Sequence, residues 1–253
     1  MATAAIVPPQ DPQQPAPLSE GERLLDTFIA PSKTFTDLRR NASWWAPFLI
    51  TAIISLIFVY VVDQKIGFRK VAENQIQAQP KQAERMERMP AADREKAMDT
   101  QVKFTRNFSY LFTVFILGWY ALVAAVLFAT LKFAFSADVK FKTLFALVFY
   151  ASVPGLLKSI LAILSIVAGV SSDTFTFQNP VATNPGYFID RAANPVLAAL
   201  LTPFDVFTLW VLALTAIGIT CISKVKSGAA FAVVFGWFLV IVLVGVGFAA
   251  AFS

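Results

Sequence analysis

Two charged side chains, Lys158 and Asp205, lie deep inside apolar stretches of the sequence and are the first candidates for chemistry. Lys158 stands twelve residues before Val170, where we expect its span to end, and Asp205 stands ten residues after Pro195. At 1.5 Å per residue these separations correspond to depths of about 18 Å and about 15 Å below one membrane surface. Because an unpaired charge at such a depth is costly, the similar depths predict an ion pair or a hydrogen-bonded pair inside a helix bundle.

Pro203 leaves a second interpretation open. A proline two residues before Asp205 can break the helix, and Asp205 would then stand at the start of a span, where an acid suits the helix dipole. Lys158 would in that case extend its long side chain toward the membrane surface. The two interpretations differ in whether the two residues meet.

The residue types that many enzymes and metalloproteins need are missing from the chain. It contains no histidine, which excludes Ser-His-Asp and Cys-His catalysis and histidine-ligated zinc or haem. Its one cysteine, Cys221, allows neither an internal disulfide nor a thiolate metal cluster. The glycine spacing of a phosphate-binding loop is also absent. We therefore predict no catalytic residue, no metal site and no cofactor.

The composition indicates the kind of fold that must position these residues. Of 253 residues 57% are hydrophobic and only 15% are charged, and the mean hydropathy is +0.64. The charges are segregated, because 17 of the 37 lie in 63–106 and only 11 in 107–253. A soluble domain of this size does not bury so much apolar length. The sequence predicts an all-α, polytopic transmembrane bundle.

The apolar runs divide this membrane domain, residues 44–253, into five helices. The first run has nineteen residues without a charge and begins at Trp44 and Trp45, which suits a bilayer core of about 30 Å with aromatic residues at its interface. Pro154 and Gly155 interrupt the third run. The expected spans are 44–62, 107–135, 143–170, 196–222 and 229–252.

The segment before the first span is expected to have two parts. Residues 1–18 are rich in proline and glutamine and read as a disordered tail. Residues 19–43 read as two amphipathic interfacial helices, the first with a capping box from Ser19 to Glu22 and the second capped by Ser32. The alternative is that their apolar side chains pack on the cytoplasmic face of the bundle. The predicted membrane-surface contacts are Leu24, Leu25, Phe28, Phe35 and Leu38.

Residues 63–106 form a polar insertion between the first two spans. Acidic and basic residues alternate in it, which is typical of solvated helices and not of a nucleic-acid-binding stripe. We expect two or three exposed helices here, the last continuing into the second span, and no nucleic-acid partner.

The distribution of lysine and arginine predicts the orientation. With a cytoplasmic N-terminus, the short loops hold nine basic residues inside and one outside, as the positive-inside rule requires. The insertion 63–106, with ten basic residues outside, opposes this orientation. We give the short loops more weight and predict a cytoplasmic N-terminus.

The order and spacing of four stretches resemble the bacterial branch of the Yip domain family (Ypt-interacting protein, Yip-one type). The resemblance implies a five-span protein of the bacterial inner membrane with a cytoplasmic N-terminus. Eukaryotic relatives act in vesicle traffic and bind prenylated Rab-type GTPases, but GTPase binding is not carried over, because the tail has no matching motif. The stretches are PSKTFTDLRRNASWWAPFLI (31–50), RMPAADRE (88–95), FYASVPGLLKSIL (149–161) and NPVLAALLTPFDVFTLWVLALTAIGIT (194–220).

Two classes of function follow from these features. The first is a non-enzymatic membrane protein that organises the membrane or recruits partners, with the lipid bilayer, other membrane proteins or a second copy of itself as partners. The alternative is a small transporter or channel that uses the broken third span and the Lys158/Asp205 region, since charges at membrane depth often mark permeation routes. An intramembrane enzyme is least favoured, because the sequence has no paired Asp-Asp motif.

Overall fold

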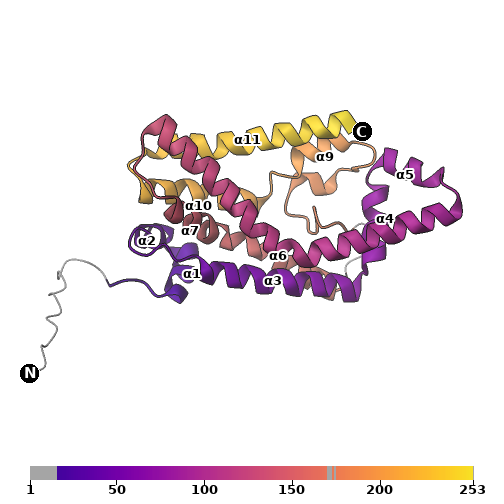
Figure 1. The fold of residues 1–253 in the computed structure, drawn as a ribbon, viewed down its shortest axis with the longest axis horizontal. Helices are drawn as coiled ribbons and strands as arrows, with labels where there is room; N and C mark the ends of the chain where they lie inside the picture. Colours follow the sequence, from indigo (N-terminus) through magenta and orange to yellow (C-terminus); the bar gives the residue numbers. More distant parts are fainter. Residues whose placement is uncertain (1–15, 170–172, 174, 253) are drawn as a thin grey trace, which may run out of the picture.

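The computed structural model describes residues 16–169, 173 and 175–252, and this part of the chain is helical throughout, with turns and no strand (Figure 1). The all-α prediction is therefore confirmed. Most of the predicted tail, residues 1–15, and Val170 at the end of the third span lie outside the described residues. The helices are α1 (Glu20–Ile29), α2 (Pro31–Asp37), α3 (Trp45–Lys65), α4 (Phe68–Gln77), α5 (Pro80–Glu87), α6 (Ala91–Phe135), α7 (Phe141–Ser152), η1 (Val153–Gly155), α8 (Leu156–Val167), η3 (Pro185–Phe188), α9 (Pro195–Leu201), α10 (Val206–Ile222) and α11 (Ser227–Phe252).

Four helical segments of the described chain are long and apolar enough to cross a membrane: α3, α6, α7–α8 and α11. The pair α9 and α10 gives a fifth if it is counted as one span bent by 43°. The helix pair α1–α2 and the C-terminal end of α11 lie toward opposite ends of the long axis (Figure 1). The prediction of a polytopic helical bundle is confirmed.

The predicted fourth span, 196–222, is not one continuous helix. α9 ends at Leu201, and α10 begins at Val206 with Asp205 as its N-cap residue. Pro203 explains the break, since proline has no backbone N–H to donate and its ring clashes with the preceding helical turn. The third span is interrupted more mildly, because Pro154 lies in the 3-10 turn η1 between α7 and α8.

The insertion 63–106 is only partly solvated. Its last helix runs without interruption into the second span as α6, as predicted. α4, however, packs on α6 and buries Phe68, Val71 and Ile76. The guanidinium of Arg69 holds this contact from outside with two hydrogen bonds of 3.0 Å to the carboxylate of Glu95 on α6.

The core lies around α7, which packs against α6, α10 and α1, and it continues through α10 to α2 and α11. α7 and α10 approach closely, since a Cβ atom on Gly218 would lie 2.6 Å from the side chain of Leu147. Phe35 and Leu38 belong to this core and are fully buried. The prediction that these two side chains contact the membrane surface is wrong, because α2 packs against α10.

The capping box of α1 forms as predicted, with hydrogen bonds in both directions between Ser19 and Glu22. The predicted cap of α2 is wrong. Pro31 is its first residue and Ala30 its N-cap residue, with no side-chain cap. Proline suits this place because its fixed φ is helical and the N–H it lacks would be unpaired there.

Candidate functional site

Lys158 and Asp205 meet at the break between α9 and α10. The Nζ atom of Lys158 lies 2.9 Å from Oδ2 of Asp205, whose side chain is 1% exposed. The structure combines the two interpretations of the sequence, because the helix does break after Leu201 and the two charges nevertheless come together. Asp205 starts α10, while Lys158 lies in the first turn of α8.

The carboxylate of Asp205 is hydrogen-bonded through both oxygens. Oδ1 accepts from the backbone N–H groups of Phe207 at 3.0 Å and Thr208 at 3.4 Å, which are otherwise unpaired at the start of a helix. Oδ2 accepts from the hydroxyl of Thr183 and, at 3.5 Å, from the amide of Asn184. One carboxylate therefore caps α10, pairs with Lys158 and holds the preceding loop.

Gly186 brings the loop against the break. A Cβ atom at this position would lie 2.5 Å from the backbone nitrogen of Thr202 and 2.8 Å from its Cα. The backbone N–H of Val206 also donates to the carbonyl of Thr183 at 3.1 Å. Sequence reasoning missed Thr183, Asn184 and Gly186. The only indication in the sequence is that the loop is rich in turn-forming residues, and this composition does not predict which residues they contact.

A cavity of about 580 Å³ adjoins this site, and Lys158, whose side chain is 23% exposed, forms part of its wall. Amide and hydroxyl side chains line one part of the cavity and phenylalanine rings another, a combination suited to a ligand with polar and apolar parts. It lies between α3, α4, α6, α8 and the loop 177–180. Its lining residues are Ser55, Phe58, Val59, Gln75, Gln79, Gln101, Phe104, Thr105, Phe108, Ser109, Phe112, Gly155, Lys158, Ser159, Phe177, Gln178 and Pro180.

A second buried ion pair joins α1 to α2, and a hydrogen bond from α7 holds this helix pair to the bundle. The guanidinium of Arg23 contacts Asp37 Oδ2 at 2.6 Å and Glu20 at 3.3 Å, and the hydroxyl of Tyr150 on α7 donates to Glu20. Burial acts to lower the pKa of Arg23, but the hydrogen bond and negative charge of Asp37 outweigh it, so that this pKa lies above its ordinary value. Thr34 also donates to the carbonyl of Arg23 at 2.9 Å.

The predicted membrane-surface residues separate into two groups. Phe35 and Leu38 are buried, and Leu24 packs against the core. Leu25 is 68% exposed and Phe28 36%, and sequence reasoning left out Ile29, which is 80% exposed. The Phe28 ring also meets Trp210 of α10 edge to face, with 5.9 Å between ring centroids.

The described residues hold no group of three or more histidine, cysteine, aspartate or glutamate side chains that could bind a metal ion. The arrangement that they do form is a helix bundle with long apolar helices and ion pairs inside it. These features define a polytopic helical membrane protein.

A family model, the Yip1 domain, matches residues 25–249. The chain belongs to this family, and the resemblance to the Yip domain family drawn from the sequence is confirmed. The family is one of non-enzymatic membrane proteins. No curated protein and no solved structure matches the chain.

Proposed function

We propose that this protein is a non-enzymatic membrane organiser that inserts the helix pair α1–α2 into one leaflet as a fixed wedge. The observation that carries the proposal is the contrast between the two faces of α1. Arg23 is buried in an ion pair with Asp37, while Leu25 and Ile29 are 68% and 80% exposed. Moving each of these apolar side chains from water into lipid contributes about 1.5–3 kcal/mol.

The place of the wedge in the membrane is supported by its neighbours. Phe28 contacts Trp210 on α10, and the indole of Trp44, just before α3, packs on Phe145 and Phe149 of α7. Tryptophan rings favour the membrane interface. An amphipathic pair fixed beside them widens the protein in one leaflet, and this asymmetry favours curvature.

The membrane contact is tested with spin labels in a Cys221→Ala background. Labels at Leu25→Cys and Ile29→Cys are expected to be reached by oxygen and shielded from a water-soluble nickel complex. Lys33→Cys is the control on the same helix pair, because the Lys33 side chain is 66% exposed and polar. Equal access of the nickel complex to all three positions would contradict the wedge.

The effect on the membrane is tested by reconstitution into vesicles at a fixed protein-to-lipid ratio. Wild-type protein is expected to give smaller vesicles than Ile29→Glu, because a carboxylate resists insertion into the apolar layer. Phe188→Glu is the matched control, since Phe188 is 76% exposed but lies in η3. Similar vesicle sizes for wild type and Ile29→Glu would contradict the proposal.

We further propose a cytoplasmic N-terminus in a bacterial inner membrane, with the bilayer and other membrane proteins or a second copy as partners. The charge count of the short loops supports this orientation. Membrane-impermeant thiol labelling of Gln82→Cys in intact cells lacking Cys221 tests it. If this cysteine is labelled only after the membrane is opened, position 82 is cytoplasmic, and the proposed orientation is wrong.

A second candidate function is a small transporter or channel. The specific observation that favours it is the cavity beside Lys158, which has both polar and apolar lining residues and adjoins the break at η1. Solute flux into vesicles that is lost in Lys158→Met, with unchanged vesicle size, would favour this candidate. Flux that never exceeds that of empty vesicles would exclude it.

A further inference from the structure

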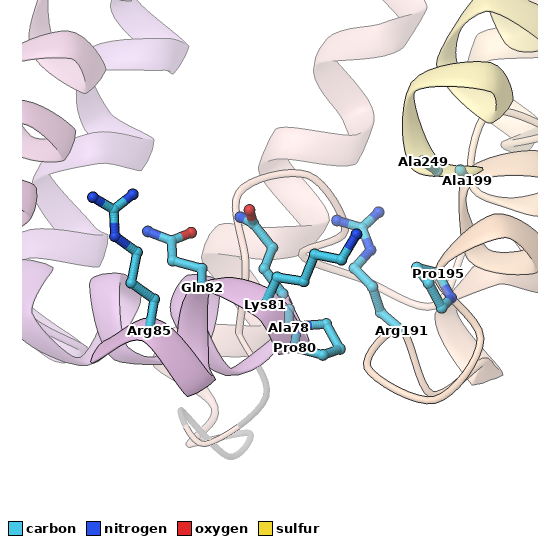
Figure 2. A pocket seen from close by; sticks show the side chains of 10 residues that line it. Ala78, Pro80, Lys81, Gln82, Arg85, Arg191, Pro195, Ala199 and Ala249 are labelled. Carbon is cyan, nitrogen blue, oxygen red and sulfur yellow. The ribbon is translucent and has the colours of Figure 1, made fainter. Parts of the chain in front are cut away.

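A second cavity, of about 630 Å³, is lined by neither Lys158 nor Asp205 (Figure 2). It is formed by α5, the turn after η3, α9 and the C-terminal part of α11. Three of its side chains are cationic and the others are neutral. The lining residues are Ala78, Gln79, Pro80, Lys81, Gln82, Arg85, Arg191, Pro195, Ala199 and Ala249.

The cations come from opposite walls. Lys81 and Arg85 are on α5, and Arg191 is in the turn before α9. Figure 2 shows the side chain of Lys81 extending toward the guanidinium of Arg191. No acidic residue lines the cavity, so these like charges repel one another unless an anion lies between them.

The three cations have no ion pair within the part of the chain that the structure describes. Two nearby acids are already engaged. Glu84 pairs with Arg88, and the carboxylate of Asp190 accepts from the backbone N–H groups of Ala192 and Ala193 at 2.9 and 3.2 Å.

The position of Arg191 is fixed by the turn that carries it. The backbone carbonyl of Asp190 accepts from Asn194 at 2.8 Å, and with the bonds to its carboxylate it closes a tight turn from 190 to 194. Burial lowers the pKa of Arg191, although an arginine side chain keeps its charge at neutral pH. A guanidinium held partly out of water in this way gains from a bound anion.

The part of the wall that α9 and α11 form is apolar. Ala199 is on α9, and Ala249 is close to the end of α11, a helix long and apolar enough to span a bilayer. Lipid headgroups lie at the ends of such helices. α9 also exposes Leu197 and Leu200, which are side chains of the kind that acyl chains cover.

We propose that this cavity binds the phosphate group of an anionic phospholipid between Lys81 and Arg191, with Arg85 as a third cation at its rim. This site goes beyond the proposed function, which does not depend on it. A lipid is favoured over a soluble phosphate for two reasons. The cavity is far larger than one phosphate group fills, and part of its wall comes from the end of a membrane helix. Basic pockets beside membrane helices recognise headgroups by this chemistry.

The test compares full-length protein in detergent with two variants of equal charge change. The first carries Lys81→Gln, Arg85→Gln and Arg191→Gln. The matched control carries Arg94→Gln, Lys96→Gln and Lys103→Gln, three exposed cations of α6 outside the cavity. Thermal unfolding is followed during titration with phosphatidylglycerol, phosphatidylcholine or inorganic phosphate, and native mass spectrometry counts the bound lipids.

Phosphatidylglycerol is expected to raise the unfolding temperature of wild type and control, with at least a tenfold weaker apparent affinity in the cavity variant and no effect of phosphatidylcholine. An equal loss in the control would overturn the proposal, because binding would then follow net charge. Stabilisation by inorganic phosphate at the same concentration would overturn the lipid as ligand. If the triple variant does not fold, Lys81→Gln and Arg191→Gln are titrated singly, and unchanged affinity in both would overturn the site.

Discussion

The Arg23–Asp37 pair and the Lys158–Asp205 pair both bury a carboxylate, but they differ in the surroundings of the cation. The side chain of Arg23 is 2% exposed, and that of Lys158 is 23% exposed and faces a cavity. Arg23 contacts a second acid, Glu20, whereas Lys158 pairs with one carboxylate among the described residues. The first pair forms a closed contact between helices, and the second leaves one side of its cation accessible.

The two pairs also connect different parts of the chain. Arg23 and Asp37 are 14 residues apart in one helix pair, which Tyr150 links to α7. Lys158 and Asp205 join α8 to a break in another membrane segment. The closed local pair joins the two helices of a surface element, and the long-range pair ties two membrane segments together beside a cavity.

The largest effect is expected from Arg23→Ala. It removes the closer of two cations that contact the buried Asp37 carboxylate and leaves Arg40 at 4.0 Å. We therefore expect a loss of about 3 kcal/mol of unfolding free energy, the lower end of the cost of breaking a buried pair. Denaturant unfolding in mixed micelles measures this loss. Arg88→Ala is the control, since its pair with Glu84 is exposed and contributes about 0.3–0.5 kcal/mol. Equal effects of the two substitutions would erase the contrast between a closed pair and an ordinary surface pair.

The second largest effect is expected from Asp205→Asn, at about 2–3 kcal/mol, less than for a fully enclosed pair because Lys158 is partly exposed. Asparagine caps a helix as well as aspartate does, so this variant keeps the cap. It removes the charge together with the oxygen that accepts from Thr183 and Asn184. Combined with Lys158→Met, it gives a double-mutant cycle by unfolding in micelles.

A double variant that loses less stability than the sum of the single variants is the expected outcome. Additive losses would mean that the two charges are neighbours without interacting. The direct charge exchange, Lys158→Asp with Asp205→Lys, is expected to recover only part of the stability. A lysine at position 205 cannot accept the hydrogen bonds from Phe207 and Thr208 that Asp205 accepts.

The sequence predicted the architecture well because membrane spans leave a strong signal. Long apolar runs predict the helices. The similar depths of Lys158 and Asp205 below one membrane surface predicted their contact, although they are 47 residues apart in the sequence. This estimate of depth assumed a straight fourth helix, which Pro203 breaks. The pair forms because Asp205 is the N-cap residue of α10, and α10 begins beside α8. It does not form because Asp205 lies at a matching depth within one continuous helix.

The environment of the remaining site residues depends on tertiary contacts, which the spacing of apolar residues in the sequence does not reveal. Phe35 and Leu38 have the spacing of a membrane-facing stripe, but the spacing does not say whether lipid or α10 covers them. Thr183 and Asn184 are ordinary loop residues in the sequence. They matter because the chain returns to the helix break, and that return is a tertiary contact.

Gly186→Ala sharpens the comparison by acting on the loop that supports only the second pair. The new methyl group would press on the backbone of Thr202, so we expect a loss of about 1–2 kcal/mol. Gly21→Ala is the control within the helix pair of Arg23. It meets nothing within 4 Å, and alanine is expected to stabilise the helix by about 0.5–1 kcal/mol. Unfolding in micelles should therefore give opposite signs, and a shared sign would contradict this packing.

The smallest effect is expected at the start of α1, where Ser19→Ala removes the cap that precedes Arg23 and costs about 1 kcal/mol.

The two hydrogen bonds between Ser19 and Glu22 also make the stability of the start of α1 depend on pH. The backbone N–H of Ser19, and then its hydroxyl, lower the pKa of Glu22. A carboxyl group with a lowered pKa stabilises the fold at pH values above its ordinary pKa, and this contribution disappears as the pH falls through the lowered value. The stability difference between wild type and Glu22→Ala should accordingly shrink on acidification, while the effect of Gly186→Ala should not change. Thermal unfolding in detergent measures both as the pH is lowered from neutral until Glu22 is protonated. A Glu22→Ala difference that persists after protonation would show that the charge of Glu22 does not hold the cap.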